Sequence, residues 1–336
     1  MKKKIIFIYP VYSTFIKNDY NLLQKHYNLT KFHFKPSKNL FKMLFQFLKQ
    51  FLYLIFNIWR FDAVYIWFAD YHSLMPVLFS YLTGKKSIIV IGGYDVCRIP
   101  DIKYGAFYSN FRGWFTAKSM KLTSINITVS KNVDRKTKVI APYTDRKLIY
   151  NGVNLLPDDS NQQKENIVLT VAIIAEKQTF YIKGIDTYLK VATRLPEYSF
   201  YIIGIKPEMI PHYFTYLPDN IIIVDKITQQ ALVDYYKRAK VYCQLSLMES
   251  FGIALAEAML FECIPVVSRV GALPEVVGNT GYCVKRNITE IANTIKKIMD
   301  SDNVIPGQKA KKQIINNFML KYREEKLQIT MAELLK

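Results

Sequence analysis

Cysteine is scarce in this chain of 336 residues, and its pattern excludes two kinds of site. The four cysteines, Cys97, Cys243, Cys263 and Cys283, are scattered through apolar segments. There is no Cys-x-x-Cys pair and no Cys/His spacing typical of metal ligands, so neither a zinc site nor a disulfide framework is expected. We expect reduced thiols in a cytoplasmic protein.

Acidic residues are scarce in the first half of the chain. Residues 1–165 contain 25 Lys and Arg against 10 Asp and Glu, whereas the remaining residues contain 21 against 17. A basic half suits nucleic acid, an anionic membrane or phosphorylated substrates. No basic run interleaved with aromatic residues forms a nucleic-acid motif, so we expect no nucleic-acid partner and favour membrane and phosphate.

Two apolar segments invite comparison with a signal peptide and with a membrane-spanning helix, and each lacks a feature that such a segment requires. The start, MKKKIIFIYPVY, places lysines before an apolar run, but the run is short and meets Pro10 without a cleavage site, so it predicts a buried strand. Residues 40–59, LFKMLFQFLKQFLYLIFNIW, contain Lys42 and Lys49, and these two charges argue against a spanning helix.

Two alternatives remain for residues 40–59. At 3.6 residues per turn, Lys42, Gln46, Lys49 and Tyr53 form one narrow polar stripe. An interfacial helix on an anionic membrane, with Phe45 and Trp59 among its aromatic contacts, fits this pattern. A core helix with one wetted edge fits it nearly as well.

The short apolar runs elsewhere predict an α/β protein. Residues 5–10, 63–68, 86–93, 125–130 and 138–143 are expected as strands of a first parallel sheet, and 166–174, 198–204, 220–225, 239–246 and 263–268 as strands of a second. Helical segments between them indicate two doubly wound, Rossmann-like domains facing a cleft. We expect domains at 1–158 and 159–314, a linker within 154–166, and a final helix over 315–336 that packs back toward the first domain.

The stretch MESFGIALAEAM, residues 248–259, is expected to start a helix after the strand that ends near Ser246. Ser250 is the predicted N-cap. The backbone N–H groups of Phe251, Gly252 and Ile253 would then point out of the helix end, where a phosphate binds readily.

Two carboxylates flank this helix end. Glu249 lies just before it and Glu257 two turns into it. Both are suited to accept hydrogen bonds from hydroxyl pairs on either side of a diphosphate, as in a nucleotide sugar. The alternative is a loop charge at Glu249 and a solvated helix face at Glu257, and spacing alone favours that alternative.

Three segments together resemble a known family. ESFGIALAEAMLFECIPVVSRVGALPEVVGNTGYCV (249–284), IKGIDTYLKVATRLPEYSFYIIG (182–204) and YNGVN (150–154) are similar to segments of the retaining, two-Rossmann-domain glycosyltransferases of the GT-B fold. This is the group 1, family 4-like set with a Glu-x7-Glu motif, which includes sucrose and glycogen synthases. The resemblance covers residues 150–284 well and the N-terminal half loosely.

The resemblance implies roles for single residues. Glu249 would lie beside the hydroxyls of the transferred sugar, and Glu257 would accept the ribose hydroxyls. Lys183, followed by Gly184 at a strand-to-helix loop, would neutralise the leaving diphosphate, although an ordinary surface lysine has the same sequence context. The family's usual arginine before this lysine is absent, and Lys177 is the nearby basic substitute.

On the acceptor side the resemblance is weaker. The usual glycine-rich loop after the first strand is missing, and Tyr12, Ser13 and Thr14 stand there instead, either as contacts to the acceptor or as a plain connection between strand and helix. Gly92, Gly93 and Asp95 follow a predicted strand where many relatives have a histidine. Asp95 is expected either to bind sugar hydroxyls or to serve as a turn residue. His72 is expected to be structural.

These features predict a peripheral membrane glycosyltransferase on the cytoplasmic face. It would move a sugar, with retention, from a nucleotide diphosphate-sugar to a glycan acceptor, lipid-linked as in surface polysaccharide assembly. No Asp-x-Asp pair ends a strand, so we expect neither a metal nor a cofactor. The alternatives are a nucleotide-sugar epimerase of the same fold and a catalytically silent nucleotide-sugar or membrane-binding module.

Overall fold

The computed structural model describes residues 2–156, 163–206, 208 and 217–336. The chain divides into two compact units, unit 1 with residues 1–151 and 321–336, and unit 2 with residues 152–320. The expected domain boundaries were 158/159 and 314/315. The predicted linker at 154–166 falls partly outside the described residues.

Unit 1 is built on a parallel sheet with the strand order β2-β1-β3-β4-β5-β6. The central strands are almost wholly buried, as their continuous apolar sequences require. The strands are β1 (Lys4–Tyr9), β2 (Asn28–His33), β3 (Ala63–Trp67), β4 (Lys86–Ile91), β5 (Ile125–Thr128) and β6 (Arg146–Leu148).

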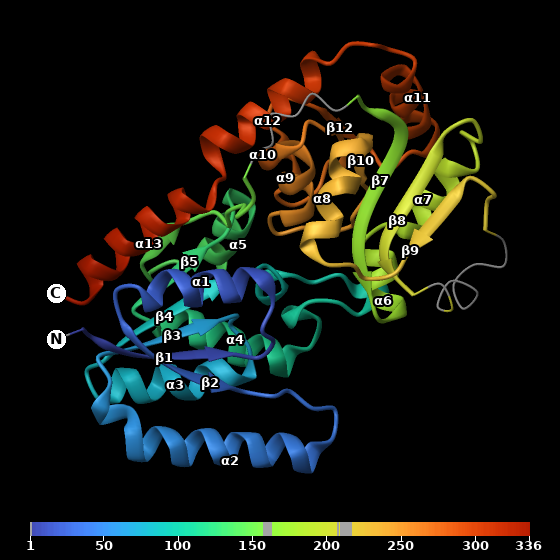
Figure 1. Ribbon diagram of the computed structural model, residues 1–336. Coiled ribbons are helices and arrows are strands. Elements are labelled where there is room, and N and C mark those ends of the chain that lie inside the picture. Colours follow the sequence, from blue (N-terminus) through green and yellow to red (C-terminus); the bar gives the residue numbers. More distant parts are fainter. Residues whose placement is uncertain (1, 157–162, 207, 209–216) are drawn as a thin grey trace. The chain divides into compact units, whose positions relative to one another are not determined.

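Helices cover both faces of this sheet. Figure 1 shows α1 on one face and α2 and α3 on the other. The helices of unit 1 are α1 (Thr14–Gln24), α2 (Leu40–Asn57), α3 (Tyr71–Leu82), α4 (Asn110–Leu122), α5 (Lys131–Ile140) and α13 (Leu320–Leu334). Short 3₁₀ turns occupy Ile58–Arg60, Tyr94–Val96, Pro100–Ile102 and Ala106–Tyr108.

One predicted strand of the first sheet is wrong. Residues 138–143 were expected to pair in the sheet, but α5 runs through Ile140. Ser130 caps this helix by accepting a hydrogen bond from the N–H of Val133. The cap and the burial of Val133 and Thr137 on one face favour helix over strand. The sheet ends instead with β6, a three-residue strand whose charged sequence gives no apolar signal.

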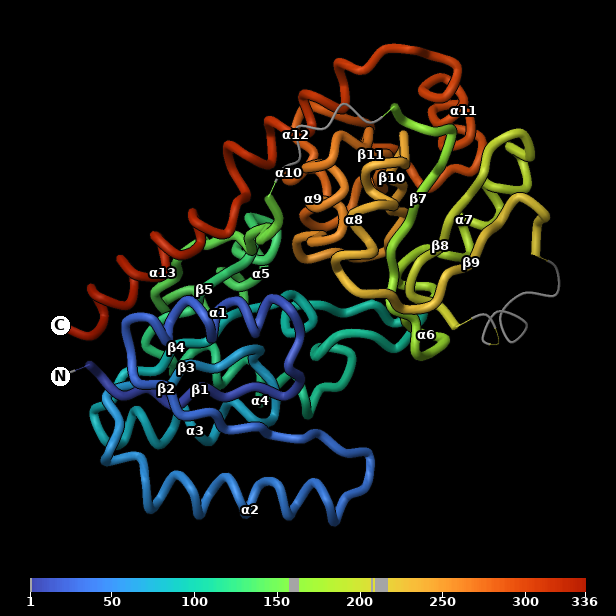
Figure 2. The backbone as a smooth tube through the Cα atoms, viewed as in Figure 1, coloured from blue at the N-terminus to red at the C-terminus, as the bar shows by residue number. Residues whose placement is uncertain are grey.

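The last helix returns to unit 1, as predicted. Arg323 of α13 is 3% exposed and donates to both carboxylate oxygens of Asp19 in α1, at 2.5 and 2.7 Å. The hydroxyl of Tyr65 donates to the same carboxylate at 2.7 Å. Figure 2 shows the chain running from α12 into α13 at its C-terminal end.

Unit 2 contains a second parallel sheet with the strand order β12-β11-β10-β7-β8-β9. Its strands are β7 (Glu165–Ile174), β8 (Ser199–Ile205), β9 (Ile221–Val224), β10 (Ala239–Gln244), β11 (Ile264–Ser268) and β12 (Tyr282–Val284). Its helices are α6 (Lys177–Ile182), α7 (Ile185–Ala192), α8 (Gln229–Arg238), α9 (Ile253–Leu260), α10 (Leu273–Val277), α11 (Ile288–Met299) and α12 (Ile305–Asn317).

The predicted fold class is thus confirmed: two doubly wound parallel sheets, each flanked by helices, with a returning C-terminal helix. The edge strands β2, β6 and β12 were not predicted: β2 and β6 carry polar and charged residues in place of a continuous apolar run, and β12 has only three residues.

Candidate active site

The loop between β10 and α9 carries the predicted anion-binding helix end. The helix begins at Ile253, with Gly252 as its N-cap in the left-handed region at φ 92°. The prediction that Ser250 caps the helix is therefore wrong, and the Ser250 hydroxyl instead contacts Sδ of Met248 at 3.9 Å. The turn into the helix lies two residues later than expected because it passes through glycine, which adopts this conformation without strain.

The start of α9 leaves backbone donors outside the helical ladder. Ala256 donates to the carbonyl oxygen of Gly252 at 3.0 Å. The N–H groups of Ile253, Ala254 and Leu255 precede that bond, as at the start of any α-helix. Together with the positive end of the helix dipole, they suit an anion. Of the three N–H groups that the sequence placed at the helix end, only that of Ile253 is among these, because Phe251 and Gly252 precede the helix.

This loop is held in place from one side. Ala272 donates its N–H to the carbonyl oxygen of Glu249 at 3.0 Å, and a Cβ at Gly271 would lie 2.0 Å from that same oxygen. Phe251 is 2% exposed, and its ring packs edge-on against Phe318 with the centroids 5.5 Å apart. The Phe251 side chain is therefore part of the core of unit 2, and only its backbone is suited to the predicted donor contact.

Lys183 and Glu249 meet at this helix end. The Lys183 ammonium donates to Oε2 of Glu249 at 2.8 Å, and the two side chains are 31% and 14% exposed. The corner between α6 and α7 brings Lys183 there, since Leu247 donates its N–H to the carbonyl oxygen of Ile182 at 2.7 Å. Gly184 has φ 71°, and a Cβ on it would lie 1.9 Å from a backbone oxygen of the β10 end. The glycine is therefore required for the approach that forms the pair.

Gln244, the last residue of β10, is a third member that the sequence did not predict. Its Nε2 donates to the same Glu249 oxygen at 2.7 Å, and the side chain is 6% exposed. Among the described residues, Oε1 of Glu249 has no hydrogen-bond partner. One carboxylate oxygen is thus held by two donors while the other is available to a ligand. A polar residue ending an apolar strand is the signal that identifies Gln244.

Glu257 is buried, whereas the alternative considered above placed it on a solvated helix face. It is 6% exposed, and its two oxygens accept hydrogen bonds from Nε2 of Gln229 at 2.9 Å and from the hydroxyl of Tyr236 at 3.2 Å. Burial raises the pKa of Glu257 to about 7, although both hydrogen bonds act in the opposite direction. The solvated-face alternative is therefore wrong. Gln229 and Tyr236, both of α8, were not predicted because nothing in the sequence links α8 to α9.

Lys177 is the first residue of α6 and is exposed. Its ammonium has no hydrogen-bond or ion-pair partner among the described residues. The substitution of Lys177 for the missing arginine remains a prediction. Of the two lysines, Lys183 is the one that contacts Glu249.

The structure decides between the two alternatives for Asp95. Its side chain is fully buried and accepts hydrogen bonds from the backbone N–H groups of Ala69, Gly92 and Gly93 at 3.1, 3.1 and 2.6 Å. Burial raises the pKa of Asp95 to about 7 against these hydrogen bonds. Direct binding of sugar hydroxyls by Asp95 is therefore excluded in this conformation, and the turn role holds.

The two glycines beside Asp95 have steric reasons to be there. A Cβ at Gly92 would lie 2.1 Å from the ring of Phe68, which itself has a positive φ of 68°. Gly93 has φ 108°. Both shape the connection between β4 and the following turn, and a contact of their backbone with acceptor remains a prediction.

The remaining predicted acceptor residues lie after β1. Tyr12 is 39% exposed, and the Lys31 ammonium lies 4.5 Å from its ring centroid. Ser13 precedes α1, and its hydroxyl is buried without a hydrogen-bond partner among the described residues. His72 is structural, as expected: it is 2% exposed and Nε2 lies 3.0 Å from the carbonyl oxygen of Trp67.

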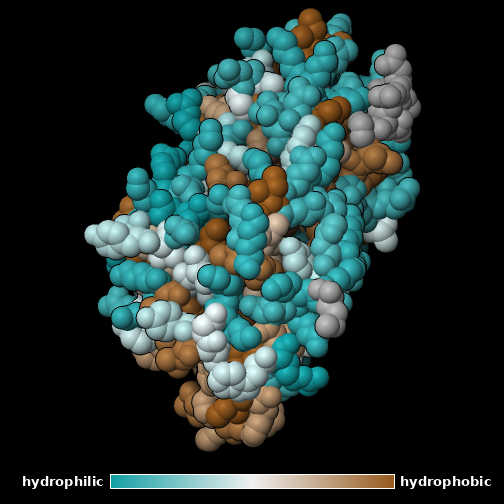
Figure 3. Space-filling model, turned by 90° about the vertical axis from the view of Figure 1, so that its left-hand side faces the viewer, coloured by the Kyte–Doolittle hydropathy of each residue, from teal (hydrophilic) through white to brown (hydrophobic). Residues whose placement is uncertain are grey.

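The exposure of α2 rules out the core-helix alternative for residues 40–59. Within the helix only Gln50 and Leu54 are fully buried. Phe45 and Trp59, the latter just past the helix, are 63% and 67% exposed. Brown, hydrophobic side chains gather at the bottom of Figure 3, where α2 lies. Lys42 and Lys49 are exposed beside them, and the Lys49 ammonium lies 5.8 Å from the ring centroid of Phe32.

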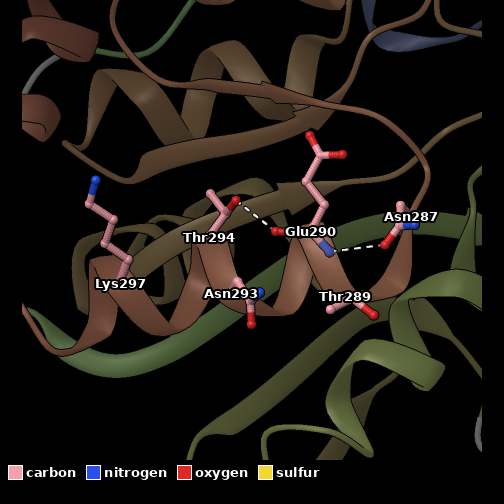
Figure 4. A pocket seen from close by; sticks show the side chains of 6 residues that line it. All are labelled: Asn287, Thr289, Glu290, Asn293, Thr294 and Lys297. Carbon is pink, nitrogen blue, oxygen red and sulfur yellow. Dashed lines mark hydrogen bonds between the residues drawn. The ribbon is translucent and has the colours of Figure 1, made fainter.

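A shallow, open depression of about 610 Å³ lies along α11. Figure 4 shows that its lining side chains come from one helix and the residue before it, and that two of the hydrogen bonds are local to the helix. None of the predicted site residues lines it. A second cavity, at the start of α2, is described below.

Two structural features bear on metal binding and on membrane spanning. Over residues 2–156, 163–206, 208 and 217–336, no group of three or more His, Cys, Asp or Glu side chains is placed to hold a metal ion. In the same ranges no helix has both the length and the apolar character needed to cross a bilayer.

Residues 156–318 match the family described as glycosyl transferases group 1. The chain is 29% identical over 173 residues to an uncharacterized 41.2 kDa protein in the cps region of Klebsiella pneumoniae, covering 47% of this chain and 46% of the relative. It is 30% identical over 134 residues to the phosphatidylinositol N-acetylglucosaminyltransferase gpi3 subunit of Schizosaccharomyces pombe, covering 37% and 28%. The match thus spans less than half the length of either relative.

Among solved structures, Anabaena HepE in complex with UDP-glucose is similar over 98% of this chain and 100% of that chain, with a TM-score of 0.72 and 13% identity. At 13% sequence identity this similarity shows the fold alone. It agrees with the two parallel sheets described above. The chain therefore has the GT-B fold, and its residues 156–318 are similar to the glycosyl transferases group 1 family.

Proposed function

We propose that the protein transfers a sugar, with retention of configuration, from a nucleotide diphosphate-sugar to a glycan acceptor. The observation that carries this proposal is the contact between the Lys183 ammonium and the Glu249 carboxylate beside the start of α9, 2.8 Å apart. A cation, a carboxylate with one uncommitted oxygen and a helix end together match a diphosphate joined to a sugar.

The parts of the donor are assigned by charge and hydrogen-bonding capacity. The diphosphate is placed on the N–H groups at the start of α9 and on Lys183. Because an ammonium has three donor positions, Lys183 is able to bind phosphate while it still contacts Glu249. The free oxygen of Glu249 accepts from a hydroxyl of the transferred sugar, and Glu257 accepts from the ribose.

In the proposed reaction the bond between the anomeric carbon and the leaving phosphate oxygen breaks, and a bond to an acceptor hydroxyl oxygen forms on the same face. The acceptor proton passes to the leaving phosphate. Negative charge grows on that phosphate in the transition state, where Lys183 and the helix end stabilise it. We propose that no divalent ion is needed, which activity in the presence of a chelator tests directly.

We further propose a lipid-linked glycan acceptor in surface polysaccharide assembly, and peripheral association with the inner face of the cell membrane. The exposed apolar side chains of α2 support the membrane part. Among the relatives, one is named as a phosphatidylinositol N-acetylglucosaminyltransferase subunit and another as a protein in a cps region.

Incubation of the purified protein with a panel of radiolabelled nucleotide diphosphate-sugars and a lipid extract tests the proposal. Label that moves into the lipid fraction with an unchanged anomeric configuration is the expected result. Conversion of the donor into an isomeric sugar nucleotide favours the epimerase. Tight donor binding without turnover on the whole panel favours the silent module.

A further inference from the structure

A groove lies between the segment that follows β2 and the first turns of α2. It encloses about 450 Å³, and its lining includes two lysines and two phenylalanines, Lys35, Lys42, Phe41 and Phe45. The segment is tied to the helix by Gln46, whose Oε1 accepts the backbone N–H of Lys35 at 3.4 Å. We refer to this cavity as the α2 groove.

The charge around the α2 groove has one sign. Between Tyr20 and Phe61 the sequence contains Lys and Arg at seven positions and no Asp or Glu. Neither the Lys35 nor the Lys42 ammonium has an ion-pair partner among the described residues. The two cations therefore have no internal carboxylate that competes with an external anion.

The α2 groove is continuous with a large apolar surface. Phe41 and Phe45, which line it, are 81% and 63% exposed. The same outward face of the helix continues with Leu48, Leu52 and Phe56, exposed by 53%, 44% and 74%. An interfacial helix lies in the plane of the membrane, so this apolar row would face the acyl boundary along its whole length, while the two cations beside its first turns stay at the level of the headgroup phosphates.

We propose that the α2 groove binds the phosphate of an anionic phospholipid while the apolar face of α2 lies in the membrane interface. Lys35 and Lys42 supply the charge, and Phe41 and Phe45 contact the glycerol and upper acyl region. This inference rests on the membrane association in the proposed function and adds a ligand class and a site to it. A soluble phosphate compound would not require the adjoining apolar face.

Vesicle flotation with the full-length protein tests the site. The K35A/K42A double variant is compared with wild type on phosphatidylcholine vesicles containing about 30% phosphatidylglycerol, and each lysine at an anionic surface is expected to contribute about five-fold. We expect the double variant to bind about 20-fold to 30-fold more weakly. The matched control is K309A/K312A on α12, where both lysines are exposed, and it should bind within about two-fold of wild type.

Two further arms separate the sources of negative charge. Vesicles with cholesteryl hemisuccinate at equal surface charge supply carboxylates in place of phosphates, and equal binding to them would overturn a phosphate site. Vesicles with undecaprenyl phosphate at equal surface charge test an isoprenoid-linked ligand. Clearly tighter binding there than to phosphatidylglycerol would move the site from bulk phospholipid to a lipid-linked substrate and overturn the assignment made here.

The failures of the two proposals are distinguishable. Wild-type binding that K35A/K42A does not weaken would refute the α2 groove as a phosphate site and leave membrane association intact. No wild-type binding to any vesicle would refute both the groove and the membrane association. Sugar transfer from a soluble donor is measured separately and depends on neither result.

Discussion

Lys183 and Glu249 are 66 positions apart in the sequence, yet their side chains meet at 2.8 Å. The contact depends on the corner between α6 and α7 lying against the end of β10, which only a glycine at position 184 allows. The structure therefore brings together the two residues for which the sequence analysis predicted roles in the same reaction.

Replacement of Lys183 by alanine should lower kcat about 100-fold, because a charge that stabilises the leaving diphosphate is removed. Steady-state transfer of labelled sugar is the measurement. Lys190→Ala is the matched control, since Lys190 is an exposed lysine of the next helix, α7, and no role at the site is predicted for it. An equal loss in both variants would mean that the overall positive potential matters more than the contact with Glu249.

Replacement of Gln244 by leucine should lower kcat about ten-fold with little change in KM, since Glu249 loses one of the two donors that orient it. The side chains are similar in volume, so the melting temperature should stay close to that of wild type. Gln244→Glu is the complementary variant, because it places a second negative charge against Glu249. A normal kcat in both variants would remove Gln244 from the site.

Glu257 should make stability depend on pH. Its pKa of about 7 in the folded protein lies above its ordinary value, so the folded state binds the proton more tightly than the unfolded state does. The stability contributed by Glu257 is therefore present at acidic pH and is lost as the pH rises through about 7. Urea unfolding at about pH 5 and about pH 8 should show a larger loss for wild type than for Glu257→Gln.

The same residue should couple donor binding to pH. Ribose hydroxyls donate to the ionised carboxylate, so affinity for an intact nucleotide diphosphate-sugar should rise between about pH 6 and about pH 8. Glu257→Gln should bind the donor more weakly and without this pH dependence. Calorimetric titration is the measurement, and the ribose assignment fails if wild type and variant have the same profile.

The anchor of the last helix should dominate the stability of unit 1. Arg323 and Asp19 form a buried ion pair, and removal of one partner leaves an unpaired buried charge, which costs about 3 to 5 kcal/mol. Arg323→Met should therefore destabilise the protein by about this amount in urea unfolding. The next residue provides the control: Glu324 pairs with Lys25 in an exposed setting, so Glu324→Ala should cost less than about 1 kcal/mol.

Sequence patterns predicted the parts of this protein that depend on local chemistry. Continuous apolar runs located the central strands, and MESFGIALAEAM located α9 and the two glutamates. They did not locate Gln229 and Tyr236, because their contact with Glu257 arises from the packing of α8 against α9. The cap at Ser250 failed for a similar reason, since the Gly271 turn and the Glu249 carbonyl fix the loop from a distant segment. The role of Asp95 could not be predicted either, because a turn aspartate and a ligand-binding aspartate beside Gly92 and Gly93 have the same sequence pattern. Only the burial of the side chain separates the two.

A crystal structure with the nucleoside diphosphate of the donor tests the central claim most directly. The account predicts the distal phosphate within about 3 Å of the Lys183 ammonium and the ribose hydroxyls at the Glu257 carboxylate. A nucleotide bound away from the start of α9, with Lys183 and Glu249 still paired only to each other, would contradict it.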